Sequence, residues 1–146
     1  DLWITNAVHG KRDNPYRLTV YCQNHEGYLS LCELLSRGWM ENQYLGRGEV
    51  RLEWLTLENC KGLICLSGGP QGVIEQHLLE DNKGEAKAAL EQLRAAFPGR
   101  FYLEVQRAGR KNDEAVVAHI AELAVGIAHG GNTPGAVPAS RRFQCS

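Results

Sequence analysis

The 146-residue sequence lacks the features that mark several specialised classes of protein. Charge is balanced, with 16 Lys and Arg against 17 Asp and Glu, so composition does not indicate nucleic acid or an acidic membrane as a partner. No apolar run in the sequence approaches membrane-spanning length, and nothing in it resembles a signal peptide. We therefore expect one modest domain with a real core and no membrane association.

Paired cysteines are also missing. The five cysteines are Cys22, Cys32, Cys60, Cys65 and Cys145, and none belongs to a CxxC motif. This spacing does not support a zinc site, whereas Cys22, Cys32 and Cys65 occupy apolar or periodic stretches. We expect reduced thiols, buried at these three positions, in a cytoplasmic protein.

The chain is organised around an apolar run that stops at Ser-Gly-Gly-Pro (residues 67–70) and is followed at once by a helical pattern. Continuous hydrophobicity at 63–66 predicts a strand buried on both faces. The turn admits two interpretations, a phosphate cradle or a plain strand-to-helix turn, and the absence of GxGxxG and GxxxxGK[ST] favours the second. Ser67 resembles half a nucleophile elbow, but GxSxG is absent.

Strands and helices alternate along the chain, which predicts an α/β fold with a parallel sheet or barrel. Apolar residues of the first helix, such as Tyr28, Leu35 and Trp39, recur at helical spacing after a candidate N-cap, Asn24. The stretches 9–15 and 41–48 are expected to be polar loops. The predicted strands are 2–5, 16–22, 63–66 and 101–105, and the predicted helices begin near 25, 73, 85 and 113.

No catalytic constellation can be assembled from these residues. The histidines are scattered, one in each of several elements or loops: His9, His25, His77, His119 and His129. Acidic residues on the helices are expected to be solvated: Glu33, Glu75, Glu80, Glu91 and Glu122. Two other acids, Glu53 and Glu104, could approach a site. Loop cations either contact phosphate or are merely solvated: Arg47 with Arg51, and Arg107 with Arg110 and Lys111.

Four blocks carry a family resemblance: RLTVYCQNHEGYLSLCELLSRGW, EWLTLENCKGLICLSGGPQG, FPGRFYLEVQRAGRKNDE and AVVAHIAELA. Over residues 1–127 they resemble the PHP (polymerase and histidinol phosphatase) domain of bacterial DNA polymerase III alpha subunits. The resemblance implies the later part of a distorted seven-stranded β/α barrel. Its first third, with the opening HxH motif, and the polymerase modules would then be missing. The initial Asp, in place of Met, also indicates an excerpt or a processed product.

In active members of this family, histidines and acids hold metal ions for phosphoester cleavage. By the resemblance, Asp1 occupies a ligand position, Arg17 replaces a histidine, and Arg107 and Ala108 replace an Asp-His pair. A guanidinium cannot coordinate a metal ion and repels it electrostatically. We therefore expect a degenerate domain without metal, cofactor or catalytic residues of its own.

The resemblance implies a non-catalytic scaffold that stabilises the polymerase and docks its proofreading exonuclease (epsilon) subunit. The parent chain would be a Mg-dependent DNA polymerase that contacts DNA. The alternative is an active metal-dependent phosphoesterase or 3′–5′ exonuclease. A weaker hypothesis assigns template phosphate contacts to Arg107 and Arg110.

The last stretch, residues 128–146, has no periodicity and no match to the family. Read one base further on, with permitted codons, it yields PMVATHPVQFLQADDFNA, which resembles the strand motif that follows in the family. We interpret residues 128–146 as a frame-shifted, disordered tail. Even the shifted frame places Pro and Gln where active members carry metal-binding Asp and His.

The coding DNA across codons 120–146 tests this interpretation. A one-base shift is expected to yield PMVATHPVQFLQADDFNA, because the permitted codons allow it throughout. Sequencing the gene decides the matter, and a shifted frame without that string would make the tail a genuine divergent terminus.

Overall fold

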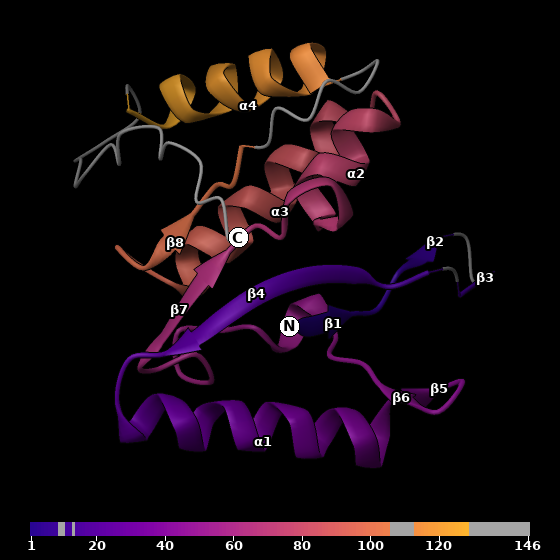
Figure 1. Ribbon diagram of the computed structural model, residues 1–146, viewed down its shortest axis with the longest axis vertical. Helices are drawn as coiled ribbons and strands as arrows, with labels where there is room; N and C mark the ends of the chain where they lie inside the picture. Colours follow the sequence, from indigo (N-terminus) through magenta and orange to yellow (C-terminus); the bar gives the residue numbers. More distant parts are fainter. Residues whose placement is uncertain (9–10, 13, 106–112, 129–146) are drawn as a thin grey trace, which may run out of the picture.

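The computed structural model describes residues 1–8, 11–12, 14–105 and 113–128. Its centre is a four-stranded sheet in the order β1, β4, β7, β8, formed by Leu2–Ile4, Tyr16–Cys22, Leu63–Leu66 and Phe101–Tyr102. Figure 1 shows helix α1 on one side of strands β4 and β7, and helices α2, α3 and α4 on the other. The mixed α/β class predicted from the sequence is confirmed.

The strand directions differ from the parallel arrangement that we expected. Strand β4 runs antiparallel to both β1 and β7, and only β7 and β8 are parallel. The segment between α1 and β7 contains a hairpin and a 3-10 turn, η1 (Leu52–Trp54). These elements return the chain in the opposite direction, which a simple alternation of strand and helix does not predict. Within the described residues the sheet has two ends, β1 and β8, and no barrel is closed.

Helix α1 (His25–Glu41) begins where the sequence predicted. The side chain of Asn24 accepts a hydrogen bond from the Gly27 N–H at 2.9 Å, which satisfies one of the free amides of the first turn. Its buried positions are Gly27, Leu34 and Gly38. The large apolar residues that revealed the helix in the sequence lie mostly outside this buried face.

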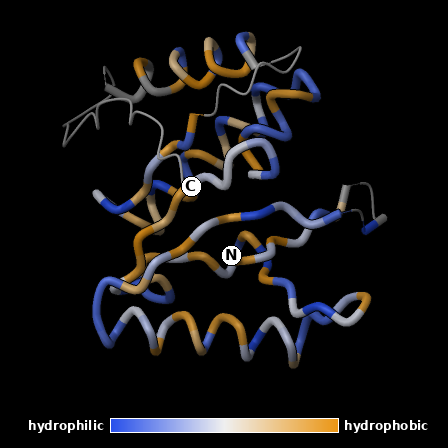
Figure 2. The backbone as a smooth tube through the Cα atoms, in the orientation of Figure 1, coloured by the Kyte–Doolittle hydropathy of each residue, from blue (hydrophilic) through white to orange (hydrophobic). Residues whose placement is uncertain are grey.

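The apolar run 63–66 forms β7, in which Leu63 and Cys65 are fully buried and the two alternate residues are partly buried. Figure 2 marks this strand as hydrophobic at the middle of the molecule. A 3-10 turn, η2 (Gly69–Gln71), then leads into α2 (Val73–Leu79) and α3 (Lys83–Ala96). Helix α3 buries its predicted stripe, Ala86, Ala89, Leu90 and Leu93, and Phe97 at its end is fully buried.

The two stretches expected to be polar loops contain small hairpins. Strands β2 (Ala7–Val8) and β3 (Lys11–Arg12) form one, and β5 (Gln43–Tyr44) and β6 (Arg47–Gly48) form the other. Between them lies Glu49, which is 1% exposed and pairs with Arg12 at 3.4 Å and with Arg47 at 3.2 Å. The two cations on this buried carboxylate connect the two hairpins to each other.

Several other expectations meet different outcomes. Cys65 and Cys60 are buried and Cys32 is partly buried. Cys22, which we expected to be buried, is exposed at the end of β4, so that prediction is wrong. The strand expected at 101–105 is only two residues long. Helix α4 (Asp113–Ala128) begins as predicted. Among the described residues, no helix is long and apolar enough to cross a membrane. The tail lies outside the described residues.

We predict that Gly27→Ala destabilises the fold by roughly 2–3 kcal/mol, because an added Cβ would lie 1.9 Å from the Gly62 carbonyl oxygen. The matched control is Gly84→Ala on α3, where no atom lies within 4 Å of an added Cβ. The control should be neutral or stabilising by up to about 1 kcal/mol. Urea unfolding of the wild type and both variants measures the change in the free energy of unfolding. Equal unfolding midpoints for Gly27→Ala and Gly84→Ala would contradict the close contact at Gly27.

Candidate functional site

The sheet register brings polar groups together at the carboxyl end of β7. Thr19 pairs with Leu66 in the antiparallel ladder, so Arg17 lies opposite Gly68 at the next position on this face. The Arg17 guanidinium donates a hydrogen bond from Nη2 to the Gly68 carbonyl oxygen at 3.0 Å. Gly68 has φ +88°, and an added Cβ would lie 1.9 Å from the Arg17 carbonyl oxygen, so only glycine fits there.

Three further side chains complete this polar junction, which we define as Arg17, Ser67, Gly68, Glu75 and Glu104. The Ser67 hydroxyl donates to Glu75 Oε1 at 2.6 Å and accepts from the Glu104 backbone N–H at 3.0 Å. The Glu104 carboxylate accepts from the Gly68 N–H at 3.0 Å. The junction thus connects β4, β7 and α2 with the segment after β8.

Glu75 was expected on a solvated helix surface, and that prediction is wrong. It is 2% exposed because α2 turns this face toward the end of β7, where Ser67 is fully buried. Burial raises the pKa of the Glu75 carboxyl to about 7, and the hydrogen bond from Ser67 opposes the rise. The second oxygen, Oε2, is buried without a hydrogen-bond partner. Sequence periodicity alone could not predict that Glu75 is buried, because its burial depends on the contact with Ser67, which helical spacing does not show.

The turn after β7 has the geometry of a plain strand-to-helix connection. The Gly68 N–H, which a phosphate would need, is bonded to Glu104 of the same chain. Ser67 is fully buried with its hydroxyl engaged, so it is not presented as a nucleophile. Of the two acids that could approach a site, Glu104 does so, and Glu53 is instead exposed beside Arg51.

The metal-ligand positions implied by the family do not assemble into a binding site among the described residues. Asp1 accepts a hydrogen bond from Thr19 Oγ1 at 3.3 Å at an exposed position. Arg17, at the other implied ligand position within the described residues, pairs with Trp3 in the β1–β4 ladder. No group of three or more His, Cys, Asp or Glu side chains in the described part of the chain is arranged to hold a metal ion. Within the junction, the Arg17 guanidinium has no lone pair with which to coordinate a metal ion.

The remaining sequence candidates lie apart from the junction. His25 is exposed at the start of α1, and the ring of His77 lies 5.6 Å from that of Tyr16. Arg47 is engaged by the buried Glu49. The cluster of Arg107, Arg110 and Lys111, like His9 and His129, lies outside the described residues.

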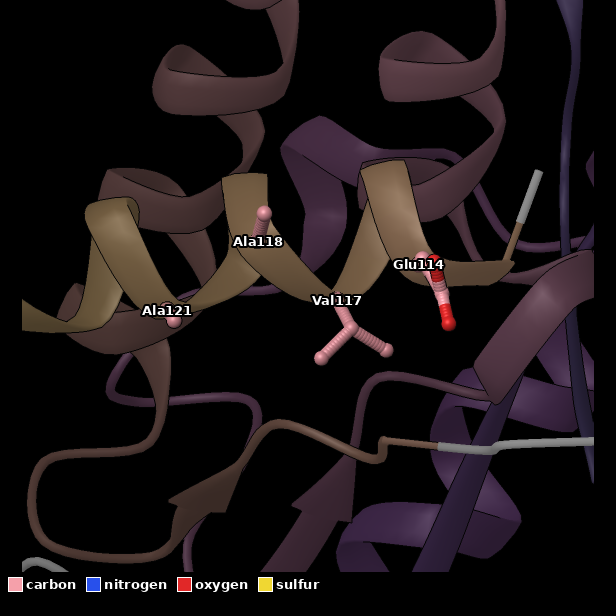
Figure 3. A pocket seen from close by; sticks show the side chains of 4 residues that line it. All are labelled: Glu114, Val117, Ala118 and Ala121. Atoms are coloured by element: carbon pink, nitrogen blue, oxygen red, sulfur yellow. The ribbon is translucent and has the colours of Figure 1, made fainter.

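A cavity of about 430 Å³ lies against α4 and is lined by Glu114, Val117, Ala118 and Ala121. Figure 3 shows Val117 and Glu114 pointing from the helix into this space. Its lining offers a single carboxylate and small apolar groups, so it has few means of holding a polar substrate.

Comparison with known proteins shows the family of this chain. Residues 2–108 match the PHP domain family, and the chain belongs to this family. It is 40% identical over 115 residues to the DNA polymerase III subunit alpha of Pseudomonas aeruginosa, covering 78% of this chain and 10% of that protein. The corresponding subunit of Neisseria meningitidis serogroup A is 38% identical over 114 residues, covering 77% of this chain and 10% of the relative.

A third relative, the DNA polymerase III subunit alpha of Pasteurella multocida, is 34% identical over 128 residues, covering 85% of this chain and 10% of the relative. The resemblance described from the sequence is therefore confirmed. The chain spans about one tenth of the length of these curated relatives.

We predict that Glu75→Gln flattens the pH dependence of stability. The folded-state pKa of Glu75 is about 7 and its ordinary value is 4.5, so the folded state binds more protons between these values. Stability should fall as pH rises from 4.5 to 7, by at most roughly 3 kcal/mol. The amide keeps the hydrogen bond from Ser67 and removes the charge.

Urea unfolding between pH 4.5 and 8 measures this effect. Glu91→Gln on the exposed face of α3 is the matched control and should keep the wild-type profile. If the free energy of unfolding changes with pH equally in Glu75→Gln and in the wild type, Glu75 does not cause the pH dependence.

Proposed function

We propose that this PHP domain is a non-catalytic scaffold within a replicative DNA polymerase chain. The observation that carries the proposal is Arg17, whose guanidinium is fixed to the Gly68 carbonyl oxygen at 3.0 Å in the junction. A permanent cation at this place satisfies the carbonyl that faces it and repels a metal ion. The neighbouring carboxylates accept hydrogen bonds from the chain itself, at Ser67 and at Gly68.

The relatives are all named as the alpha subunit of DNA polymerase III, which supports a role in DNA replication for the protein that carries this domain. In this proposal the domain stabilises the polymerase and provides a surface for the proofreading exonuclease subunit. Nucleotidyl transfer belongs to modules outside these residues, where Mg²⁺ held by carboxylates performs the chemistry. A soluble, cytoplasmic location is part of the proposal.

The alternative is an active PHP phosphoesterase or 3′–5′ exonuclease. It needs metal ligands in place of Arg17, since a guanidinium has no lone pair available for coordination.

We predict that the full-length polymerase binds no stoichiometric Mn or Zn at this domain. We also predict that the domain has no 3′–5′ exonuclease activity of its own, so that adding EDTA abolishes none. Metal analysis after gel filtration and a labelled-primer degradation assay measure both properties. Stoichiometric metal together with EDTA-sensitive degradation that survives removal of the exonuclease subunit would contradict the scaffold.

A further inference from the structure

Helix α1 presents apolar side chains to solvent, including Leu29 and Met40 as well as the seam defined next. The α1 seam consists of His25, Tyr28, Cys32, Leu35 and Trp39, whose positions alternate in steps of three and four residues. This spacing places all five on one line along the helix, the pattern by which two helices pack at a shallow angle. Tyr28 is 56% exposed, Trp39 is 52% exposed and Leu35 is 37% exposed.

The seam is exposed because α1 is locked against rotation. An added Cβ on Gly27 would lie 1.9 Å from the Gly62 carbonyl oxygen, and one on Gly38 would lie 3.0 Å from the Glu49 carbonyl oxygen. These contacts place the glycine side of the helix directly on the backbone beneath it. Rolling α1 to bury Tyr28 and Leu35 would break both contacts, so the sheet cannot cover the seam.

The aromatic ends of the seam are held in place by the domain itself. The His25 and Tyr28 rings stack with centroids 6.3 Å apart. The Trp39 ring lies against Gly48 of β6, so closely that an added Cβ there would be 2.7 Å from Trp39 Cδ1. A preorganised aromatic surface loses little conformational entropy when a partner binds.

Charge around the seam limits what can cover it. The other charged residues of α1 are Glu26, Glu33, Arg37 and Glu41, and Arg37 is bound to Glu41 at 3.0 Å and lies 4.1 Å from the Trp54 ring. Glu26 lies within electrostatic reach of Lys61, whose pKa is raised first by Glu58 and also by Glu26. Glu33 therefore supplies the carboxylate of α1 that has no ion pair within the described residues. A second copy of this helix would bring the same acidic flank against it, which is unfavourable.

We propose that the α1 seam binds an amphipathic helix with a basic flank, supplied by the remainder of the same polymerase polypeptide. This inference rests on the proposed scaffold function. About nine tenths of the length of the relatives lies outside the region that they share with this chain, so the polypeptide has ample sequence to supply such a helix. Figure 1 shows the four-stranded sheet on one side of α1. A tethered helix also binds at high effective concentration.

Hydroxyl-radical footprinting of the full-length polymerase tests the proposal, with oxidation of each side chain compared between the native and the denatured chain. Tyr28 and Trp39 should be strongly protected in the monomer, independently of protein concentration. Leu57, which is 54% exposed in this domain, is the exposure-matched control and should stay reactive. The fully buried Phe97 reports that the domain is folded.

The Tyr28→Glu variant of the full-length chain should lose the protection of Trp39, because its charge opposes docking, while Leu57→Glu should leave it intact. Reactive Tyr28 and Trp39 in the native polymerase would overturn the proposal. So would protection that requires dimer formation or addition of the exonuclease subunit. If the polymerase holds no metal at this domain and the α1 seam is reactive, only this inference is wrong, and the proposed scaffold function is unaffected.

Discussion

The structure depends on the antiparallel register between β4 and β7. Leu18 on β4 and Cys65 on β7 point into the core, so a shift by one residue would move every side chain on either strand to the wrong face. The same register sets Arg17 opposite Gly68. The position of the cation in the polar junction is thus a consequence of the packing of the core.

Two kinds of close backbone contact make this arrangement rigid. Gly68 admits the Arg17 carbonyl at the end of the sheet, and Gly27 lets α1 lie directly on Gly62 at the start of β7. The buried Glu49 performs a similar task for the hairpins by pairing with Arg12 and Arg47. A domain fixed at so many points is suited to a scaffold, since its surfaces keep a constant geometry for partners.

Sequence reasoning predicted the elements that depend on local signals. Strand β4, the N-cap at Asn24, helix α2 and the buried stripe of α3 follow from alternation, capping and periodicity. It failed where distant contacts decide. The direction of β7 relative to β4, the exposure of the apolar seam on α1 and the burial of Glu75 all depend on which surfaces meet, and periodicity contains no such information.

The candidate site divides in the same way. The family resemblance singled out Arg17, and the structure shows its guanidinium bonded to the Gly68 carbonyl oxygen. That Arg17 replaces a metal-binding histidine stays a prediction. Glu75 was assigned to the solvated surface because helical spacing does not reveal the Ser67 hydroxyl eight residues earlier. The cluster of Arg107, Arg110 and Lys111 lies outside the described residues, so the phosphate-contact hypothesis stays a prediction.

The central claim is our proposal that a guanidinium and internal hydrogen bonds, and not a metal ion, hold the junction together. Crystals of the polymerase grown with Mn²⁺ and measured at the manganese absorption edge test it most directly. The account predicts no anomalous peak at the junction and an unchanged bond from Arg17 to the Gly68 carbonyl. An anomalous peak coordinated by Glu75 or Glu104, with the Arg17 side chain displaced, would contradict it.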